Sequence, residues 1–347
     1  MSLLFIFILS VFLGILNSKN PSAGTYGLIK VLEFIFLGTY IYFNKKALSL
    51  KLIALAFSTG IIFESLLAAL QYLNHGSFQG IFYFFGERNF NTNTPGIANA
   101  SINGQLVLRP YGTFSHPNAL GGYLVIALML CAFSAKKINR FFIPVFILAA
   151  LGIFVSFSRT AFIASIVFII FFFLISVYEK YKKGKTNKPS IKQVFLILAL
   201  ISFLLVTLSL NLFSQRIFNI NFKDESVVMR TKLIDQSINM ISTNPVLGVG
   251  INNFYNNLDY KYNSPSTIQP VHNIFFLTLS ETGLVGILFL IFILLKPVRN
   301  LKNGAIILVI LILGSLDHYL FTQQQGQLLF TVTISLLLSN KLSAKIN

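Results

Sequence analysis

Runs of about twenty mainly apolar residues recur along the whole chain, and this repetition constrains the fold more than any other feature of the sequence. The hydrocarbon core of a bilayer is about 30 Å thick, which a helix crosses in roughly 20 residues. Charged residues make up only 11% of the chain, whereas soluble domains carry about 25%. Residues 1–347 are therefore predicted to form a single, all-α, polytopic membrane domain.

The apolar runs predict about ten transmembrane helices. They lie near residues 1–16, 24–43, 50–73, 118–135, 140–157, 159–178, 193–213, 271–295, 304–320 and 326–340. No small-residue cleavage site follows Leu16, so the first run is expected to be an uncleaved span rather than a signal peptide. No internal repeat of the kind found in inverted-repeat transporters is recognisable.

Lysines and arginines gather on alternate short loops, which predicts the orientation of the chain. These loops lie at residues 45–51, 136–140, 180–192, 296–302 and 341–345. The positive-inside rule makes them cytoplasmic, so both termini are expected inside and the two long polar segments, about 74–117 and 214–270, outside. The net charge of +17 then reflects topology, and no nucleic-acid partner is expected.

The second external segment, residues 214–270, has the mixed composition of a folded cap. Four aliphatic residues recur in it at helical spacing: Val227, Ile234, Ile238 and Ile241. They predict an amphipathic helix that ends at Asn244-Pro245, with Arg230 on the same apolar stripe. Because an unpaired buried charge is costly, Arg230 needs an anionic partner, which is either a loop carboxylate or a substrate phosphate.

Further polar residues gather at the predicted outer ends of the spans: Arg109, His116, Arg159, His272, Asp317 and His318. Snorkelling or structural pairing would explain each one alone, but their position on one side favours a site there. Three carboxylates lie inside predicted spans, at Glu33, Glu64 and Glu281, and each needs a partner. Lys30 precedes Glu33 by one helical turn, which predicts an ion pair between them.

The sequence does not predict a cofactor or a metal site. The four histidines and the external carboxylates show no ligand spacing, and the single cysteine, Cys131, has no partner for a disulfide. Gly248 and Gly250, in the run Pro245-Val-Leu-Gly-Val-Gly, predict a tight turn or a close backbone approach.

Taken in order, these motifs resemble the bacterial O-antigen ligase and O-antigen polymerase family. They are the segment from Gly112 to Gly122, Ser158-Arg159, the external Arg230, Asn244-Pro245-Val-Leu-Gly-Val-Gly250 and His272-Asn273. The similarity is strongest over about residues 105–290, an O-antigen ligase-like core. It implies a membrane glycosyltransferase that resembles the GT-C type, with a helical cap at the outer face of the bacterial cytoplasmic membrane.

The resemblance also implies a reaction. Glycan would pass from a polyprenyl pyrophosphate carrier to a hydroxyl group of a glycan, lipid or protein acceptor, in a metal-independent, inverting step. Arg159 and Arg230 match arginines that hold the donor pyrophosphate, and His272 matches the general base. The family features leave open whether the chain is a ligase or a polymerase.

Two alternatives come from other classes of protein. A polysaccharide or lipid-linked oligosaccharide transporter or flippase would carry polar residues through the depth of the bundle. A structural membrane protein would give its outer arginines and histidine no ligand. The concentration of polar residues at the outer ends of the spans favours the enzyme.

Overall fold

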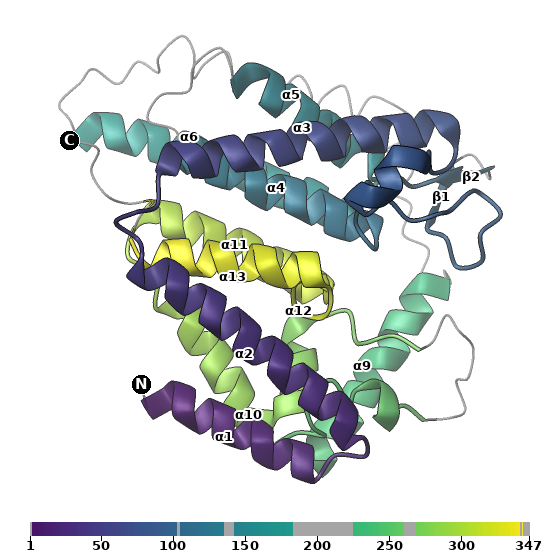
Figure 1. The fold of residues 1–347 in the computed structure, drawn as a ribbon, viewed down its shortest axis with the longest axis vertical. Coiled ribbons are helices and arrows are strands. Elements are labelled where there is room, and N and C mark those ends of the chain that lie inside the picture. The colour runs from purple at the N-terminus through teal and green to yellow at the C-terminus, as the bar shows by residue number, and fades with distance from the viewer. Residues whose placement is uncertain are drawn as a thin grey trace. The chain divides into compact units, whose positions relative to one another are not determined.

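The computed structural model describes residues 2–102, 105–134, 142–182, 225–259, 268–340 and 342. Its elements, in chain order (Figure 1), are α1 (Ser2–Leu16), α2 (Pro21–Phe43), α3 (Leu50–Asn74), η1 (Gly80–Phe85), β1 (Asn99–Ile102), β2 (Gln105–Leu108), α4 (Pro117–Ser134), α5 (Phe142–Val155), α6 (Arg159–Lys182), α9 (Glu225–Thr243), η2 (Tyr255–Asn257), α10 (Ile274–Leu295), α11 (Leu301–Leu316), α12 (Tyr319–Thr322) and α13 (Gln324–Leu338). Helices dominate, and the sheet within the described ranges is one antiparallel hairpin, β1–β2.

The helices coincide with every predicted span that falls within the described residues, while the span expected near 193–213 lies outside them. Five described helices are long and apolar enough to cross a membrane: α2, α3, α4, α6 and α10. α1, α5 and α11 are shorter apolar helices. The chain is therefore a mainly helical, multi-pass membrane protein, and the total of ten spans stays a prediction.

Local signals in the sequence place several helix ends. The Asn20 side chain accepts a hydrogen bond from the Ala23 N–H at 3.1 Å, and Pro21 occupies the first turn of α2. Both are favoured at helix N-termini. α3 ends at His75, which adopts a left-handed conformation with φ of 53°.

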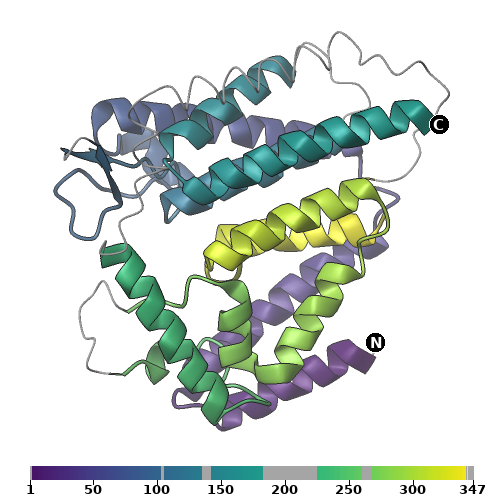
Figure 2. The same cartoon turned by 180° about the vertical axis from the view of Figure 1, so that it is seen from behind.

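The described residues form two compact units. The first comprises the described parts of Met1–Lys45, Asn221–Arg299 and Gly314–Asn340, and the second those of Lys46–Ile220, Asn300–Leu313 and Lys341–Asn347. In the first unit α1 packs on α2 and α10, α2 on α13, and α9 on α10. Figure 2 shows α9 beside α10. The Phe7 and Phe289 rings stack at 4.2 Å between α1 and α10.

In the second unit α4 lies at the centre, in contact with α3, α5 and α6 (Figure 1). Nearly every α4 residue is buried. A helix that is apolar on all sides is expected to be buried in this way. The β1–β2 hairpin and η1 lie at the same end of this unit, near the carboxyl end of α3.

α10 is broken in its middle, and the segment from Pro245 to Gly250 fills the break. Gly283 has non-helical backbone angles (φ 62°), which interrupts the helical hydrogen bonds. The Val249 and Gly250 N–H groups donate to the carbonyls of Ser280 and Glu281 at 2.8 and 3.0 Å, and Leu284 N–H donates to the Pro245 carbonyl at 2.9 Å. The predicted close backbone approach is thus confirmed, with φ values of +70° and +96° at Gly248 and Gly250.

The chain that follows this loop is tied to α10 and to the turn between α1 and α2. The Glu281 carboxylate accepts from the backbone N–H of Phe254 at 3.1 Å and also interacts with the backbone N–H groups of Asn252 and Asn253. The Asn253 side chain makes two hydrogen bonds to the backbone of Asn20. Glu281 is therefore a structural residue, which explains a carboxylate inside a span.

The other two intramembrane carboxylates also have partners. Lys30 and Glu33 form the predicted ion pair at 2.8 Å on α2. Gln324 of α13 hydrogen-bonds to both. In the second unit, Glu64 accepts hydrogen bonds from the backbone and side chain of Thr113.

Replacing Gly248 by alanine is expected to unfold the cap, since its Cβ would collide with backbone atoms of Glu281 and Thr282. Gly96→Ala is the matched control, because Gly96 also has positive φ but its Cβ would meet nothing within 4 Å. Both variants incur about 1–2 kcal/mol for a left-handed alanine, and only Gly248→Ala adds a clash. Thermal unfolding followed by circular dichroism should show a much larger decrease in melting temperature for Gly248→Ala than for Gly96→Ala. Equal decreases in the two variants would contradict this packing.

Candidate functional site

The cap helix α9 presents Arg230 beside its buried face. The helix spans Glu225–Thr243 and ends just before Asn244-Pro245, as predicted. The predicted apolar stripe is wrong in one respect: Ile238 is 51% exposed, and the buried positions are Leu233, Ser237 and Met240. The buried stripe is rotated because Ser237 packs against α10. Arg230 lies one turn before Leu233 and two turns before Ser237, and it is half-buried at the edge of this stripe.

α9 is attached to α10 by polar and apolar contacts. The hydroxyl groups of Ser237 and Ser280, both fully buried, lie 2.6 Å apart. Around them, buried apolar side chains form one cluster: Leu233, Met240, Val249, Phe254, Val271 and Leu277. This cluster places α9 over the first turns of α10.

The start of α10 fixes the position of His272. Asn273 caps the helix, because its side-chain oxygen accepts from the N–H groups of Phe275 and Phe276 at 2.8 and 3.1 Å. Its amide donates to the Ser315 carbonyl at 2.9 Å, which links this point to the end of α11. His272 therefore lies outside the helix, immediately before a rigid cap.

His272, Asp317 and His318 form one cluster. One ligand-type atom from each lies within 4.8 Å of the others. The rings of His272 and His318 have centroids 4.9 Å apart. Asp317 is buried, and its carboxylate accepts a hydrogen bond from the backbone N–H of His318 at 2.8 Å. Nδ1 of the His318 ring forms a hydrogen bond with the Thr322 hydroxyl at 2.7 Å.

The His272 ring is neutral at physiological pH. Burial is the main cause and lowers its pKa to about 4; the Asp317 carboxylate raises it, while His318 and the Arg230 cation lower it. Arg230 and Asp317 also act on His318, whose pKa is lowered by burial. Within the described residues, Nδ1 of His272 has no hydrogen-bond partner. A neutral imidazole with an unpartnered buried nitrogen is a group that can accept a proton from a ligand.

The cluster has the donor types of a metal site, since histidine and carboxylate both bind transition metals. Burial lowers the pKa of both histidines, the Asp317 carboxylate raises it, and the nearby Arg230 cation lowers it to a smaller extent and would repel a bound cation. An anionic ligand beside Arg230 suits this environment better. The absence of a metal remains a prediction.

The remaining predicted residues belong to the second unit. Arg159 is the first residue of α6, directly after Ser158, whose hydroxyl accepts from the Ala161 N–H at 3.3 Å. Arg109 is buried and donates to the Ser156 carbonyl and to Asn118, at 3.0 and 2.6 Å. His116 Nδ1 accepts from the Asn118 N–H at 3.1 Å, so Arg109 and His116 have structural contacts.

The apolar helices define the class as a multi-pass membrane protein, and His272, Asp317 and His318 gather just outside α10 and α11. The O-antigen ligase family model matches residues 144–291, from α5 to α10. This stretch carries Arg159, Arg230 and His272, and the match confirms the resemblance that the motifs predicted. Residues 144–291 therefore match an O-antigen ligase domain, which supports a role in cell-surface polysaccharide biosynthesis. No curated protein matches the chain.

The sequence predicted roles for Arg230 and His272, but it did not predict the cluster of His272, Asp317 and His318. His318 lies 46 residues after His272, and no spacing rule relates the two positions. Asp317 and His318 were both predicted at the outer end of a span, but the sequence did not pair them with His272.

The charges around His272 predict opposite effects of two substitutions on its pKa. Arg230→Gln removes a positive charge and should raise the pKa, whereas Asp317→Asn removes a negative one and should lower it. NMR titration of labelled histidine in detergent, with the signal assigned by its loss in His272→Asn, measures both shifts. Shifts of the same sign in the two variants would contradict the described geometry.

Proposed function

We propose that this protein transfers a glycan from a polyprenyl pyrophosphate carrier to a hydroxyl acceptor at the outer face of the bacterial cytoplasmic membrane. The observation that carries the proposal is the buried, neutral His272 ring, which lies within 4.8 Å of Asp317 and close enough to Arg230 for its charge to lower the histidine pKa. The family match supports glycosyl transfer as the class of reaction.

His272 acts as the general base. It takes the proton of the acceptor hydroxyl as that oxygen attacks the anomeric carbon of the donor. The Asp317 carboxylate stabilises the imidazolium that forms, since its negative charge raises the pKa of the ring. Direct attack by the acceptor inverts the anomeric centre, and no metal takes part.

Arg230 binds the donor pyrophosphate, with Arg159 proposed as the second arginine. Departure of the carrier leaves negative charge on the pyrophosphate. A guanidinium group binds phosphate through two parallel, charge-assisted hydrogen bonds. A half-buried guanidinium that forms no ion pair with other described residues is available for this contact.

His272→Ala should abolish transfer while the protein still inserts and accumulates, because general base catalysis contributes roughly 10²–10⁴ in rate. His75→Asn is the control, since His75 is exposed and left-handed, a conformation that asparagine tolerates. The measurement is the size profile of surface and carrier-linked glycans in a host that lacks the natural gene. Single capped repeats would identify a polymerase, and full-length chains stranded on the carrier a ligase. Full activity of His272→Ala would overturn the role of the base.

Arg230→Lys should also fail in the same host, because lysine keeps the charge but loses the bidentate geometry. Arg299→Lys, at an exposed arginine after the last turn of α10, should keep full activity. The comparison separates phosphate recognition from a general need for positive charge. Activity of Arg230→Lys equal to that of Arg299→Lys would exclude the bidentate contact.

A further inference from the structure

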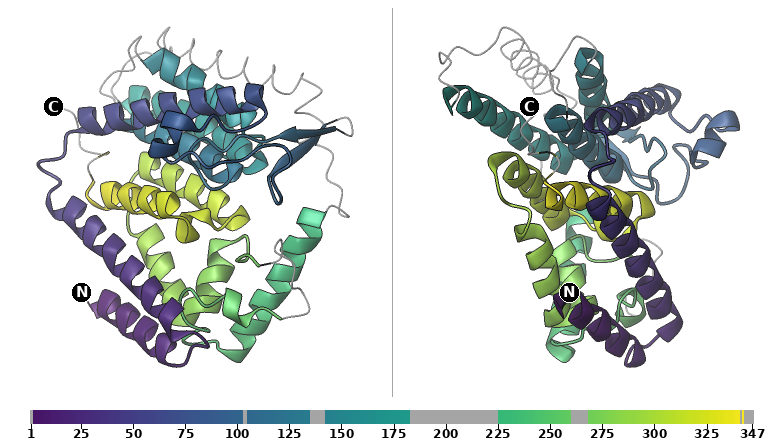
Figure 3. Two further views of the ribbon diagram at one scale, coloured as in Figure 1. Left: turned by 45° about the vertical axis from the view of Figure 1, so that its right-hand side comes forward. Right: turned by 60° about the vertical axis from the view of Figure 1, so that its left-hand side comes forward.

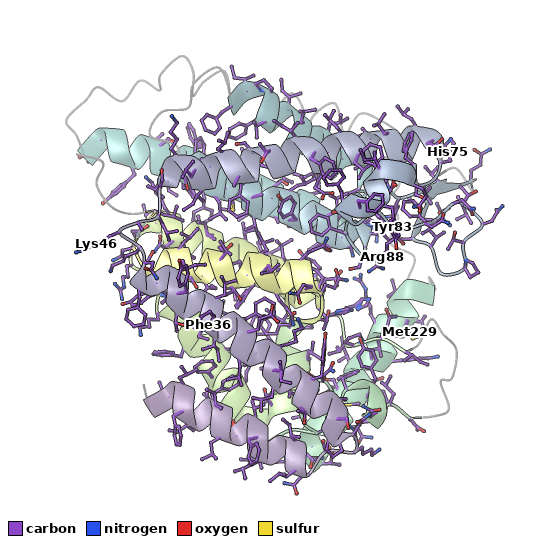
Figure 4. All side chains as sticks on the ribbon, viewed as in Figure 1. Phe36, Lys46, His75, Tyr83, Arg88 and Met229 are labelled. Carbon is purple, nitrogen blue, oxygen red and sulfur yellow. The ribbon has the colours of Figure 1, made fainter. Side chains whose placement is uncertain are left out.

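The short helix η1 presents a row of large apolar side chains that its own unit does not cover. Phe84 is 85% exposed, and its neighbours Ile81, Tyr83 and Phe85 are exposed as well. Figure 3 shows η1 at the edge of the second unit, beside α3, and Tyr83 is labelled in Figure 4. Exposing such an apolar patch to water would be energetically unfavourable, so another apolar surface is expected to cover it.

The exposed row is held rigidly rather than left on a loose loop. The buried Glu87 carboxylate accepts from the N–H groups of Phe78 and Gln79, at 3.0 and 2.6 Å. It also accepts from the Gln71 side chain of α3 at 2.8 Å. These bonds tie both ends of the segment 77–87 to a membrane-spanning helix.

The contacts of η1 with α3 give its depth. The rings of Phe82 and Phe85 lie 6.4 and 5.5 Å from that of Phe63. Phe63 precedes the last residue of α3 by eleven positions, about 16 Å along the helix axis. Any stretch of roughly 20 residues within Leu50–Asn74 includes Phe63, so η1 reaches the level of the hydrocarbon core.

Backbone N–H groups on both sides of η1 have the hydrogen-bond partners that entry into that layer requires. Hydrocarbon offers no hydrogen-bond partners, so each N–H needs one from the protein. Phe82, Gly86 and Glu87 donate to carbonyls of the same segment at 3.0–3.1 Å. On the returning strand of the loop, the Gln71 side-chain oxygen accepts from the N–H groups of Tyr111 and Gly112.

We propose that residues 77–87 form a re-entrant aromatic anchor, inserted among the lipid acyl chains of the leaflet at the Asn74 end of α3. Lipid is the occupant because the aromatic row is exposed at a depth where acyl chains surround the spans. Aromatic side chains are also favoured near this boundary. Arg88, exposed directly after Glu87, can reach the lipid phosphates by snorkelling. The anchor would fix the outer segment 74–117 against the membrane.

The test uses a fluorescent label at single cysteines in the full-length protein. Cys131, the sole cysteine, is replaced by alanine, and Phe84→Cys, Tyr83→Cys and Asn93→Cys are labelled with an environment-sensitive nitrobenzoxadiazole dye in liposomes. Asn93 is exposed at a polar turn of the same loop and is the matched control. Lipids with a nitroxide on the acyl chain quench from inside the bilayer, and iodide quenches from water.

At positions 84 and 83 the emission should shift to shorter wavelength, with quenching by the nitroxide lipids and protection from iodide. The label at position 93 should show the reverse pattern. Quenching of the 84 and 83 labels by iodide alone would overturn the proposal. A label that neither quencher reaches would also overturn it, because a protein surface would then cover the row.

Discussion

The backbone groups freed by a break in a membrane helix must find hydrogen-bond partners in the protein. The break of α10 at Gly283 therefore determines how the elements of the first unit pack together. The segment from Pro245 to Gly250 supplies those partners. Because hydrocarbon offers no alternative, this pairing is strongly enforced. The loop, once fixed on α10, holds the end of α9 on one side and the chain leading to Asn253 on the other. The charge of Arg230 therefore acts on His272 although 42 residues separate them in the sequence.

The second unit meets the same constraint with side chains instead of a broken helix. Gln71 and Glu64, two turns apart on α3, satisfy the backbone of the loop from Tyr111 to Thr113. Polar groups on the helices of both units thus accept hydrogen bonds from non-helical backbone. The proposed chemistry falls to groups just outside the helices, where His272 precedes α10 and Asp317 follows α11. Glu33, Glu64 and Glu281, the three carboxylates predicted inside spans, each have a hydrogen-bond or ion-pair partner among the described residues.

The sequence predicted the elements of the fold well, because apolar runs of bilayer length and the Asn244-Pro245 terminator depend on local chemistry. The Lys30–Glu33 pair was predictable for the same reason, since one helical turn separates the two residues. Tertiary docking was not predictable. Ser237 turns α9 so that Ile238 faces outward, and nothing in a helical pattern distinguishes a docking serine from an exposed one. The His272–His318 contact likewise depends on Asn273 bonding to Ser315, which no spacing in the sequence encodes.

Transfer by the purified protein in liposomes tests the central claim most directly. A polyprenyl pyrophosphate-linked glycan and a hydroxyl acceptor are supplied in the presence of a metal chelator. The new glycosidic product and the released carrier are then measured together. Equal amounts of both with the wild-type chain, and neither with His272→Ala, are the predicted result. Movement of the intact donor across the bilayer without release of the carrier, or full transfer by His272→Ala, would contradict the account.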